Sequence, residues 1–299
     1  MYSKRFIILS AVIVIALIVV VTLIFTLTRQ ASDNHGTDGG SFRHGELRVD
    51  FIDVGKGDCI LIRSKNHAVL IDTGYKDTAD DVFDFLDASD VSGIDELILT
   101  HYDKDHIGGA KQLLSQYPVK KLYIPDYEKD SKKYKKLLKA VDKNNVPVEC
   151  VSEEITFSAD HVRYTVMPSG VAYNDKTEND NDMSLLVTVV HGNDSCLFTG
   201  DIEEAGIRSL LQKNGRTYDL LKIPHHGRME KNTKALLESV KPKYAVITDD
   251  EDNRADSKLC RLLQNAGIDY YRTSENGTVT ITGNGSGMTV HCDKNTKSN

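Results

Sequence analysis

The length, composition and charge of the chain exclude several classes of protein. With 299 residues, of which 40% are hydrophobic and 27% charged, it is too long for a minimal module and has enough apolar material for a globular core. Its five cysteines are scattered without a CxxC pair, so we predict neither a disulfide framework nor a zinc knuckle.

The first predicted element is a membrane-spanning helix. Residues 6–28, FIILSAVIVIALIVVVTLIFTLT, carry no charge and exceed the ~20 apolar residues that a helix needs to cross a bilayer. Lys4 and Arg5 precede this stretch and only Arg29 follows closely, which favours a cytoplasmic N-terminus. We therefore predict a single-pass signal anchor in the cell membrane over residues 1–29. A cleaved signal peptide is the alternative, and both place the remainder outside the cytoplasm.

The next segment, residues 30–46, is polar and Gly-rich, and we predict a flexible linker. From position 30 onward the chain has 34 basic and 44 acidic residues, a net charge of −10. The field of this outer part repels polyanions, so a nucleic-acid partner has to bind against it.

Residues 47–299 are predicted to form one α/β domain, because short β runs alternate with helical patterns through two similar halves. This pattern is typical of two sheets covered by helices. Strands are expected at 47–52, 69–71, 96–100, 121–125, 184–190, 197–199, 220–223, 244–248 and 278–292, and helices at 78–89, 108–116, 128–145, 202–213 and 230–239.

Six of these strands run directly into polar residues. Because loops at one edge of a rigid sheet commonly build sites, we expect these side chains to converge there. They are Asp53, Asp72, His101, Asp201, His225 and Asp249.

Histidines and aspartates crowd the segment THYDKDH at 100–106, which is predicted to be a loop between strand and helix. Imidazole nitrogens and carboxylate oxygens are ligands of catalytic divalent metals, and two metals about 3.5–4 Å apart need a bridging carboxylate. Asp201 is the candidate bridge. The candidate metal ligands are His101, Asp103, Asp105, His106, Asp201, His225 and His226, with the choice between the last two left open.

These motifs resemble the metallo-β-lactamase superfamily, and more narrowly the extracellular hydrolase domain of ComEC-type competence proteins. The resemblance covers residues 47–281 through FIDVGKGDCILI, AVLIDTG, THYDKDHIGG, CLFTGDIEEAG, LLKIPHHG, KPKYAVIT and SENGTVTI. It implies an αββα sandwich and a centre of two divalent metal ions, with His101, Asp103, Asp105, His106, Asp201 and one of the paired histidines as the metal positions.

One departure from the superfamily pattern concerns metal preference. Its second histidine is Asp103 here, as in the ComEC-type subgroup. A carboxylate in place of an imidazole adds negative charge and a harder ligand, so we expect manganese or a mixed centre to be favoured over zinc.

A second departure is the missing histidine before Asp201. His191 lies in the turn of a hairpin, and seven residues of about 3.3 Å each put it roughly 20 Å from the active edge. Asp182 or Ser184, at the start of the outgoing strand, is expected to take the place of this histidine as a metal ligand, directly or through water. By the same geometry His67 is a far-edge turn residue.

Three further aspartates are expected near the centre. We predict that Asp58 and Asp72 hold the metal ligands in position without binding the metal themselves. For Asp53, a role in the site and a role in bracing the turn before Gly55 remain equally open.

The resemblance implies hydrolysis of phosphodiester bonds, with DNA as the leading substrate. Divalent metals supply hydroxide at neutral pH, Asp105 is expected to orient it, and Ser184 or Lys222 to stabilise charge on the substrate. The basic stretch Lys129–Lys143 could guide a polyanion or touch anionic lipid, although a solvated helix face explains it as well.

Three alternatives remain. A cell-wall or lipid phosphodiesterase, similar to phosphorylcholine esterases, fits an acidic outer domain equally well. Lactam or lactone hydrolysis is less favoured because of Asp103. The chain could also be a catalytically silent, membrane-tethered binding module.

Overall fold

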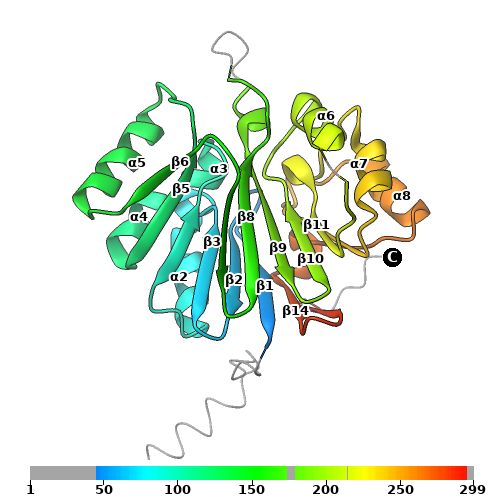
Figure 1. Ribbon diagram of the computed structural model, residues 1–299, viewed down its shortest axis with the longest axis horizontal. Coiled ribbons are helices and arrows are strands. Elements are labelled where there is room, and N and C mark those ends of the chain that lie inside the picture. The colour runs from blue at the N-terminus through cyan, green and yellow to red at the C-terminus, as the bar shows by residue number, and fades with distance from the viewer. Residues whose placement is uncertain (1–44, 174–178, 214, 295–299) are drawn as a thin grey trace, which may run out of the picture. The chain divides into compact units, whose positions relative to one another are not determined.

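The computed structural model describes residues 45–173, 179–213 and 215–294, which form two stacked sheets with helices outside each (Figure 1). The first sheet has the order β15-β14-β1-β2-β3-β4-β5-β6. Its strands are β1 (Leu47–Phe51), β2 (Ile60–Ser64), β3 (His67–Ile71), β4 (Ile94–Ile98), β5 (Val119–Pro125), β6 (Val148–Val151), β14 (Val279–Gly283) and β15 (Met288–Cys292).

The second sheet has the order β13-β12-β11-β10-β9-β8-β7. Its strands are β7 (Ile155–Ala159), β8 (Val162–Pro168), β9 (Leu185–His191), β10 (Asp194–Phe198), β11 (Leu220–Lys222), β12 (Tyr244–Ile247) and β13 (Asp269–Arg272). The helices are α2 (Ala79–Ala88), α3 (Lys104–Ile107), α4 (Ala110–Gln116), α5 (Lys132–Lys143), α6 (Glu204–Lys213), α7 (Thr233–Val240), α8 (Ser257–Asn265) and α9 (Thr273–Asn276), and the 3-10 turns are η1 (Lys76–Thr78), η2 (Asn181–Met183) and η3 (Pro224–Gly227).

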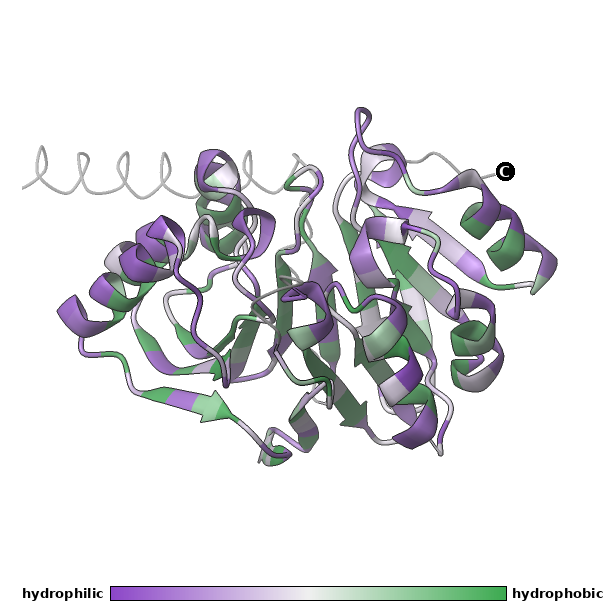
Figure 2. Ribbon diagram, turned by 90° about the horizontal axis from the view of Figure 1, so that it is seen from above, coloured by the Kyte–Doolittle hydropathy of each residue, from purple (hydrophilic) through white to green (hydrophobic). Residues whose placement is uncertain are grey.

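Alternation along the strands builds three apolar layers. Leu97 of β4 packs among residues of α2 to α5, whereas its neighbour Ile98 packs between the two sheets against strands such as β9 and β10. A third cluster joins the second sheet to α6, α7 and α8. Figure 2 shows the consequence, with hydrophobic strands inside and hydrophilic residues on the outer faces of the helices. The predicted αββα sandwich is confirmed.

Each half of the domain contains a parallel segment, β3-β4-β5-β6 in one sheet and β10-β11-β12-β13 in the other. Antiparallel strands complete both sheets. Because parallel strands end at the same edge, the loops that follow β3, β4, β10, β11 and β12 are brought together. The predicted repetition of one plan in two halves is therefore confirmed.

Three local predictions were wrong or incomplete. The segment predicted as a loop at 100–106 carries the short helix α3, which places Asp105 and His106 on helical backbone, with His106 N–H donating to the Asp103 carbonyl. Helix α5 begins at Lys132 instead of 128, because Ser131 Oγ caps it by accepting from Tyr134 N at 3.1 Å. Strands β6, β7 and β8 were not predicted.

The predicted membrane anchor at 6–28 and most of the predicted linker at 30–46 lie outside the described residues. Among the helices of the described part, none combines the length and apolar character required to cross a membrane. The anchor therefore stays a prediction.

Candidate metal centre

Four chain segments deliver the predicted ligands to one edge of the sandwich. His101 follows β4, Asp105 and His106 lie on α3, Asp201 follows β10, and His226 lies in η3 after β11. In η3 both histidines have positive φ, 49° for His225 and 52° for His226. Such backbone is costly for residues other than glycine, and it concentrates at functional sites.

The donor atoms of these residues lie close together around Asp201. Asp201 Oδ2 is 3.0 Å from His226 Nε2 and 3.2 Å from His106 Nε2, and Asp105 Oδ2 is 3.7 Å from His226 Nε2. Donor atoms of His101, His106 and Asp201 lie within 4.8 Å of one another, as do those of Asp105, His106 and His226. The structure thus brings together five of the seven predicted ligands.

The three histidines turn buried nitrogens toward one carboxylate. The Nε2 atoms of His101, His106 and His226 are buried and make no well-aligned hydrogen bond, although those of His106 and His226 lie 3.2 and 3.0 Å from Asp201 Oδ2. A buried polar nitrogen without a well-aligned partner costs about 1–3 kcal/mol, and three of them around one carboxylate can all be satisfied by a shared cation. Because imidazole and carboxylate are the donors that divalent transition metals take, the residues present fit a divalent metal ion.

The opposite nitrogen of each ring is held by the protein. His106 Nδ1 lies 2.8 Å from Asp72 Oδ2, and His226 Nδ1 lies 2.9 Å from the carbonyl oxygen of Thr248. His101 Nδ1 is 3.1 Å from Thr100 Oγ1 and 3.3 Å from Ser184 Oγ. A partner at Nδ1 fixes the ring and leaves the Nε2 lone pair for a metal.

The predicted supporting carboxylates are themselves fixed by two threonines. Thr100 donates to Asp72 from its backbone N–H at 2.8 Å and its hydroxyl at 2.7 Å. Thr248 Oγ1 donates to Asp58 Oδ1 at 2.6 Å. Sequence reasoning missed both threonines, although each stands just beyond the end of a strand, beside a residue of the predicted set.

Lys222 is fully buried behind Asp201. Its ammonium lies 2.5 Å from Asp58 Oδ2 and 3.3 Å from Asp201 Oδ1. Burial disfavours charge on Lys222, but the two carboxylates outweigh it and raise the pKa of this lysine. The geometry gives Lys222 a role through Asp201, because the side chain has no path to a substrate.

Charge in the centre follows from the same pairs. Burial opposes ionisation of Asp201, yet His226, His106 and Lys222 outweigh it and hold the pKa of this carboxyl well below its usual range. Burial, reinforced by the charge of His106, lowers the pKa of His101 to about 3. Asp201 is therefore an anion and His101 a neutral ring at neutral pH, which are the forms that bind metals.

Three predicted site residues point elsewhere. Asp103 Oδ1 accepts from Lys129 Nζ at 2.8 Å, and His225 Nδ1 lies 3.2 Å from Glu203 Oε1. Asp182 does not fill the gap left by the missing histidine, because its Oδ1 accepts from the backbone N–H groups around the start of α6 at 2.7 and 2.8 Å.

Ser184, unlike Asp182, contacts two of the candidate metal ligands. Its hydroxyl is 3.3 Å from His101 Nδ1 and accepts from Asp201 N at 3.0 Å.

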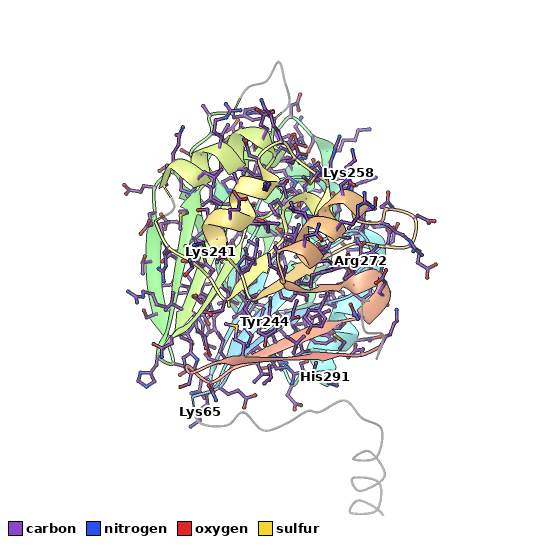
Figure 3. The ribbon with its side chains drawn as sticks, turned by 90° about the vertical axis from the view of Figure 1, so that its right-hand side faces the viewer. Lys65, Lys241, Tyr244, Lys258, Arg272 and His291 are labelled. Atoms are coloured by element: carbon purple, nitrogen blue, oxygen red, sulfur yellow. The ribbon has the colours of Figure 1, made fainter. Side chains whose placement is uncertain are left out.

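Two other strand-end aspartates have structural partners. Asp249 forms a buried ion pair with Arg272, which is labelled in Figure 3, at 2.5 Å, and Asp53 Oδ1 accepts from Gly55 N at 3.4 Å. The turn role predicted for Asp53 thus has a contact in the structure.

Comparisons with known proteins agree with this geometry. The family model described as "Metallo-beta-lactamase superfamily" matches residues 52–173. ComE operon protein 3 of Bacillus subtilis is 31% identical over 257 residues, which cover 78% of this chain and 33% of that protein. Competence protein ComA of Neisseria gonorrhoeae is 28% identical over 208 residues, covering 68% of this chain and 27% of that protein.

A solved structure shows the same fold. The metallo-beta-lactamase fold protein YhfI of Bacillus subtilis superposes with a TM-score of 0.55 at 12% identity, covering 80% of this chain and 99% of that one. The chain belongs to the metallo-β-lactamase superfamily. Within it, the similarity to ComEC-type competence proteins is confirmed, and the chain spans about a third or less of the length of the curated relatives it matches.

Proposed function

We propose that the chain is a metal-dependent hydrolase that cleaves phosphodiester bonds, with DNA as the first substrate class to test. The observation that carries the hydrolase proposal is the gathering of three buried Nε2 atoms, none with a well-aligned hydrogen bond, around the Asp201 carboxylate. Two divalent ions held by these residues would supply a hydroxide nucleophile and polarise the phosphoryl oxygens of the substrate.

The residues divide into two ligand groups that share Asp201. Asp105, His106 and His226 form one group with Asp201 beside both histidines, and His101 forms the other with Asp201 and His106, with Asp103 two residues further along the chain. Asp72 and Thr248 keep the rings of His106 and His226 oriented. Lys222 holds Asp201 in place and keeps it charged.

One cation on the rim is suited to bind an anionic substrate. Lys56, in the loop between β1 and β2, places Nζ 3.8 Å from Asp105 Oδ2 with its side chain 29% exposed. A lysine that is part solvent-exposed and next to the ligand group can contact a phosphate oxygen. The relatives named for competence support DNA as the source of that phosphate.

The test measures hydrolysis by the full-length protein loaded with Mn²⁺ or Zn²⁺. The substrates are bis(p-nitrophenyl) phosphate, single-stranded DNA, duplex DNA, a phosphorylcholine ester and a chromogenic lactam. We expect phosphodiester turnover that Asp105→Ala abolishes, while Asp77→Ala, whose carboxylate is 91% exposed, retains it. Metal should raise the melting temperature of the wild type by mass action.

The same panel separates the alternatives. Turnover of the phosphorylcholine ester without DNA cleavage would indicate a wall or lipid phosphodiesterase. Turnover of the lactam alone would contradict the proposal. Metal binding without hydrolysis of any substrate would indicate a silent binding module.

We further propose that residues 6–28 anchor the protein in the cell membrane with residues 47–299 outside. Full-length protein should stay with membranes after alkaline extraction, and a variant lacking residues 1–29 should be released. Recovery of both in the soluble fraction would contradict the anchor.

A further inference from the structure

The loop after β5 places a lysine beside the predicted ligand Asp103. Lys129 Nζ is 2.8 Å from Asp103 Oδ1 and also contacts the carboxylate of Asp180. The side chain of Lys129 is 23% exposed and that of Asp180 only 7%. An ammonium thus lies between two carboxylates, one of which occupies a metal position by family resemblance.

The two ligand groups of the centre consequently differ. Donor atoms of Asp105, His106 and His226 lie within 4.8 Å of one another, and Asp201 contacts both of these histidines, so that one group has four residues. In the other group His101 lies with Asp201 and His106, but the Asp103 carboxylate is paired with the Lys129 ammonium. Asp103 stands at the N-cap of α3, yet its side chain accepts no capping hydrogen bond that would compete with this pairing.

We propose that Lys129 is a built-in competitor for the metal ion of the His101 group. This inference rests on the proposed two-metal centre. The lysine holds the Asp103 carboxylate when the group is empty, and a divalent ion gains Asp103 only by displacing the ammonium. The two groups therefore fill in sequence and with unequal affinity.

The physical reason is that an ammonium and a divalent cation compete for the same carboxylate oxygens. A divalent ion near Asp103 also repels the positive charge of Lys129, which is held close by Asp180. The competition and the repulsion both weaken metal binding by the His101 group, and they leave metal binding by the Asp105 group unaffected. Lys129 thus acts on metal affinity through Asp103 and is a positioning residue.

The experiment is a titration of metal-free, full-length protein with Mn²⁺, followed by calorimetry and by electron paramagnetic resonance of free Mn²⁺. Wild type should bind one tight equivalent and one markedly weaker equivalent. In Lys129→Met the weaker dissociation constant should fall by roughly tenfold or more, while the tight one stays unchanged.

Two controls keep the result interpretable. Lys135→Met removes a neighbouring lysine that is 64% exposed and contacts Asp130, and it should bind Mn²⁺ as wild type does. Lys129→Arg keeps the charge and should also retain a weak second equivalent. If Lys129→Met is poorly folded without metal, excess Mn²⁺ should raise its melting temperature more than that of the wild type, because binding is then stronger.

Several outcomes would overturn the inference. If the wild type bound both Mn²⁺ equivalents with equal affinity, the proposed difference between the two ligand groups would not exist. An unchanged or weaker second equivalent in Lys129→Met would show that the lysine orients Asp103 for the metal instead. A raised KM with unchanged Mn²⁺ binding would make Lys129 a substrate contact. The Mn²⁺ titrations do not depend on turnover, so failure of the hydrolase proposal is measured separately.

Discussion

Both ends of the stacked sheets carry histidines beside carboxylates, but among the described residues only one end has the geometry of a metal centre. At the far end, His67 Nε2 lies 2.5 Å from Glu96 Oε2 and Nδ1 lies 3.5 Å from Asp95. Both ring nitrogens therefore face carboxylates. At the active end one nitrogen of each ring is held from behind, and the Nε2 atoms of several rings meet around a shared carboxylate.

Chain topology explains this difference. The far end contains hairpin turns, such as those between β2 and β3 and between β9 and β10, and His67 there meets two carboxylates of the adjacent strand β4. The active end collects loops from the parallel strands of both sheets, which brings together segments about 100 residues apart, such as those of His106 and Asp201. The same residue types thus make ion pairs at one end and a ligand set at the other.

The largest expected effect separates the paired histidines of η3. His226→Ala should lose tight metal binding and lower kcat/KM by about 10³-fold or more, because a ligand of the complete group is removed. His225→Ala should keep the metal stoichiometry of wild type, since its ring faces Glu203. Metal content after dialysis and initial rates measure both. Loss of metal from His225→Ala with retention in His226→Ala would reverse the ligand assignment.

The next effect concerns a buried cation at the active end and an exposed one at the far end. Lys222→Met leaves Asp58 and Asp201 buried without their counter-ion, which should lower the free energy of unfolding by about 3–5 kcal/mol. Lys120→Met breaks an ion pair with Asp95 at 2.6 Å, but this lysine is 78% exposed, so no measurable loss is expected. Urea unfolding of the metal-free proteins distinguishes them, and equal losses would contradict the comparison.

Much of this site was predictable because its residues stand at strand ends, where the alternation of apolar residues stops. That pattern located Asp72, His101 and Asp201, and it predicted the far-end position of His191, which pairs with Asp194 across the hairpin. The apolar strand patterns and the family resemblance also predicted the αββα layers.

What the sequence could not supply is the direction of each side chain. Nothing in PHHG distinguishes His225 from His226, since two residues with positive φ set their orientation. The choice between Asp182 and Ser184 depended on the start of α6, whose backbone N–H groups bind Asp182. Lys129 was part of a basic stretch, and only the path of the loop after β5 brings it to Asp103.

A smaller effect is expected from the carboxylates that lie behind the rings. Asp72→Asn removes the charge that orients His106, and loss of such a supporting group costs roughly 10–100-fold in metal affinity or activity. Asp95→Asn, which removes the carboxylate beside His67 at the far end, should leave both unchanged. Mn²⁺ titration of the two variants provides the measurement. A wild-type affinity in Asp72→Asn would mean that Thr100 alone fixes the ring.

The smallest effect is a pH dependence of stability at the far end. Burial disfavours the charged form of His67, but the hydrogen bond to Glu96, with the charges of Glu96, Asp95 and Asp160, outweighs it and raises the pKa of this histidine. A pKa raised in the folded state adds stability that is present below the unfolded value near 6.5 and lost as pH rises through the folded value. The difference in unfolding free energy between metal-free wild type and His67→Gln should therefore be larger at pH 5.5 than at pH 9. A difference independent of pH would show that His67 acts by packing against Tyr164 and Phe157 instead of by charge.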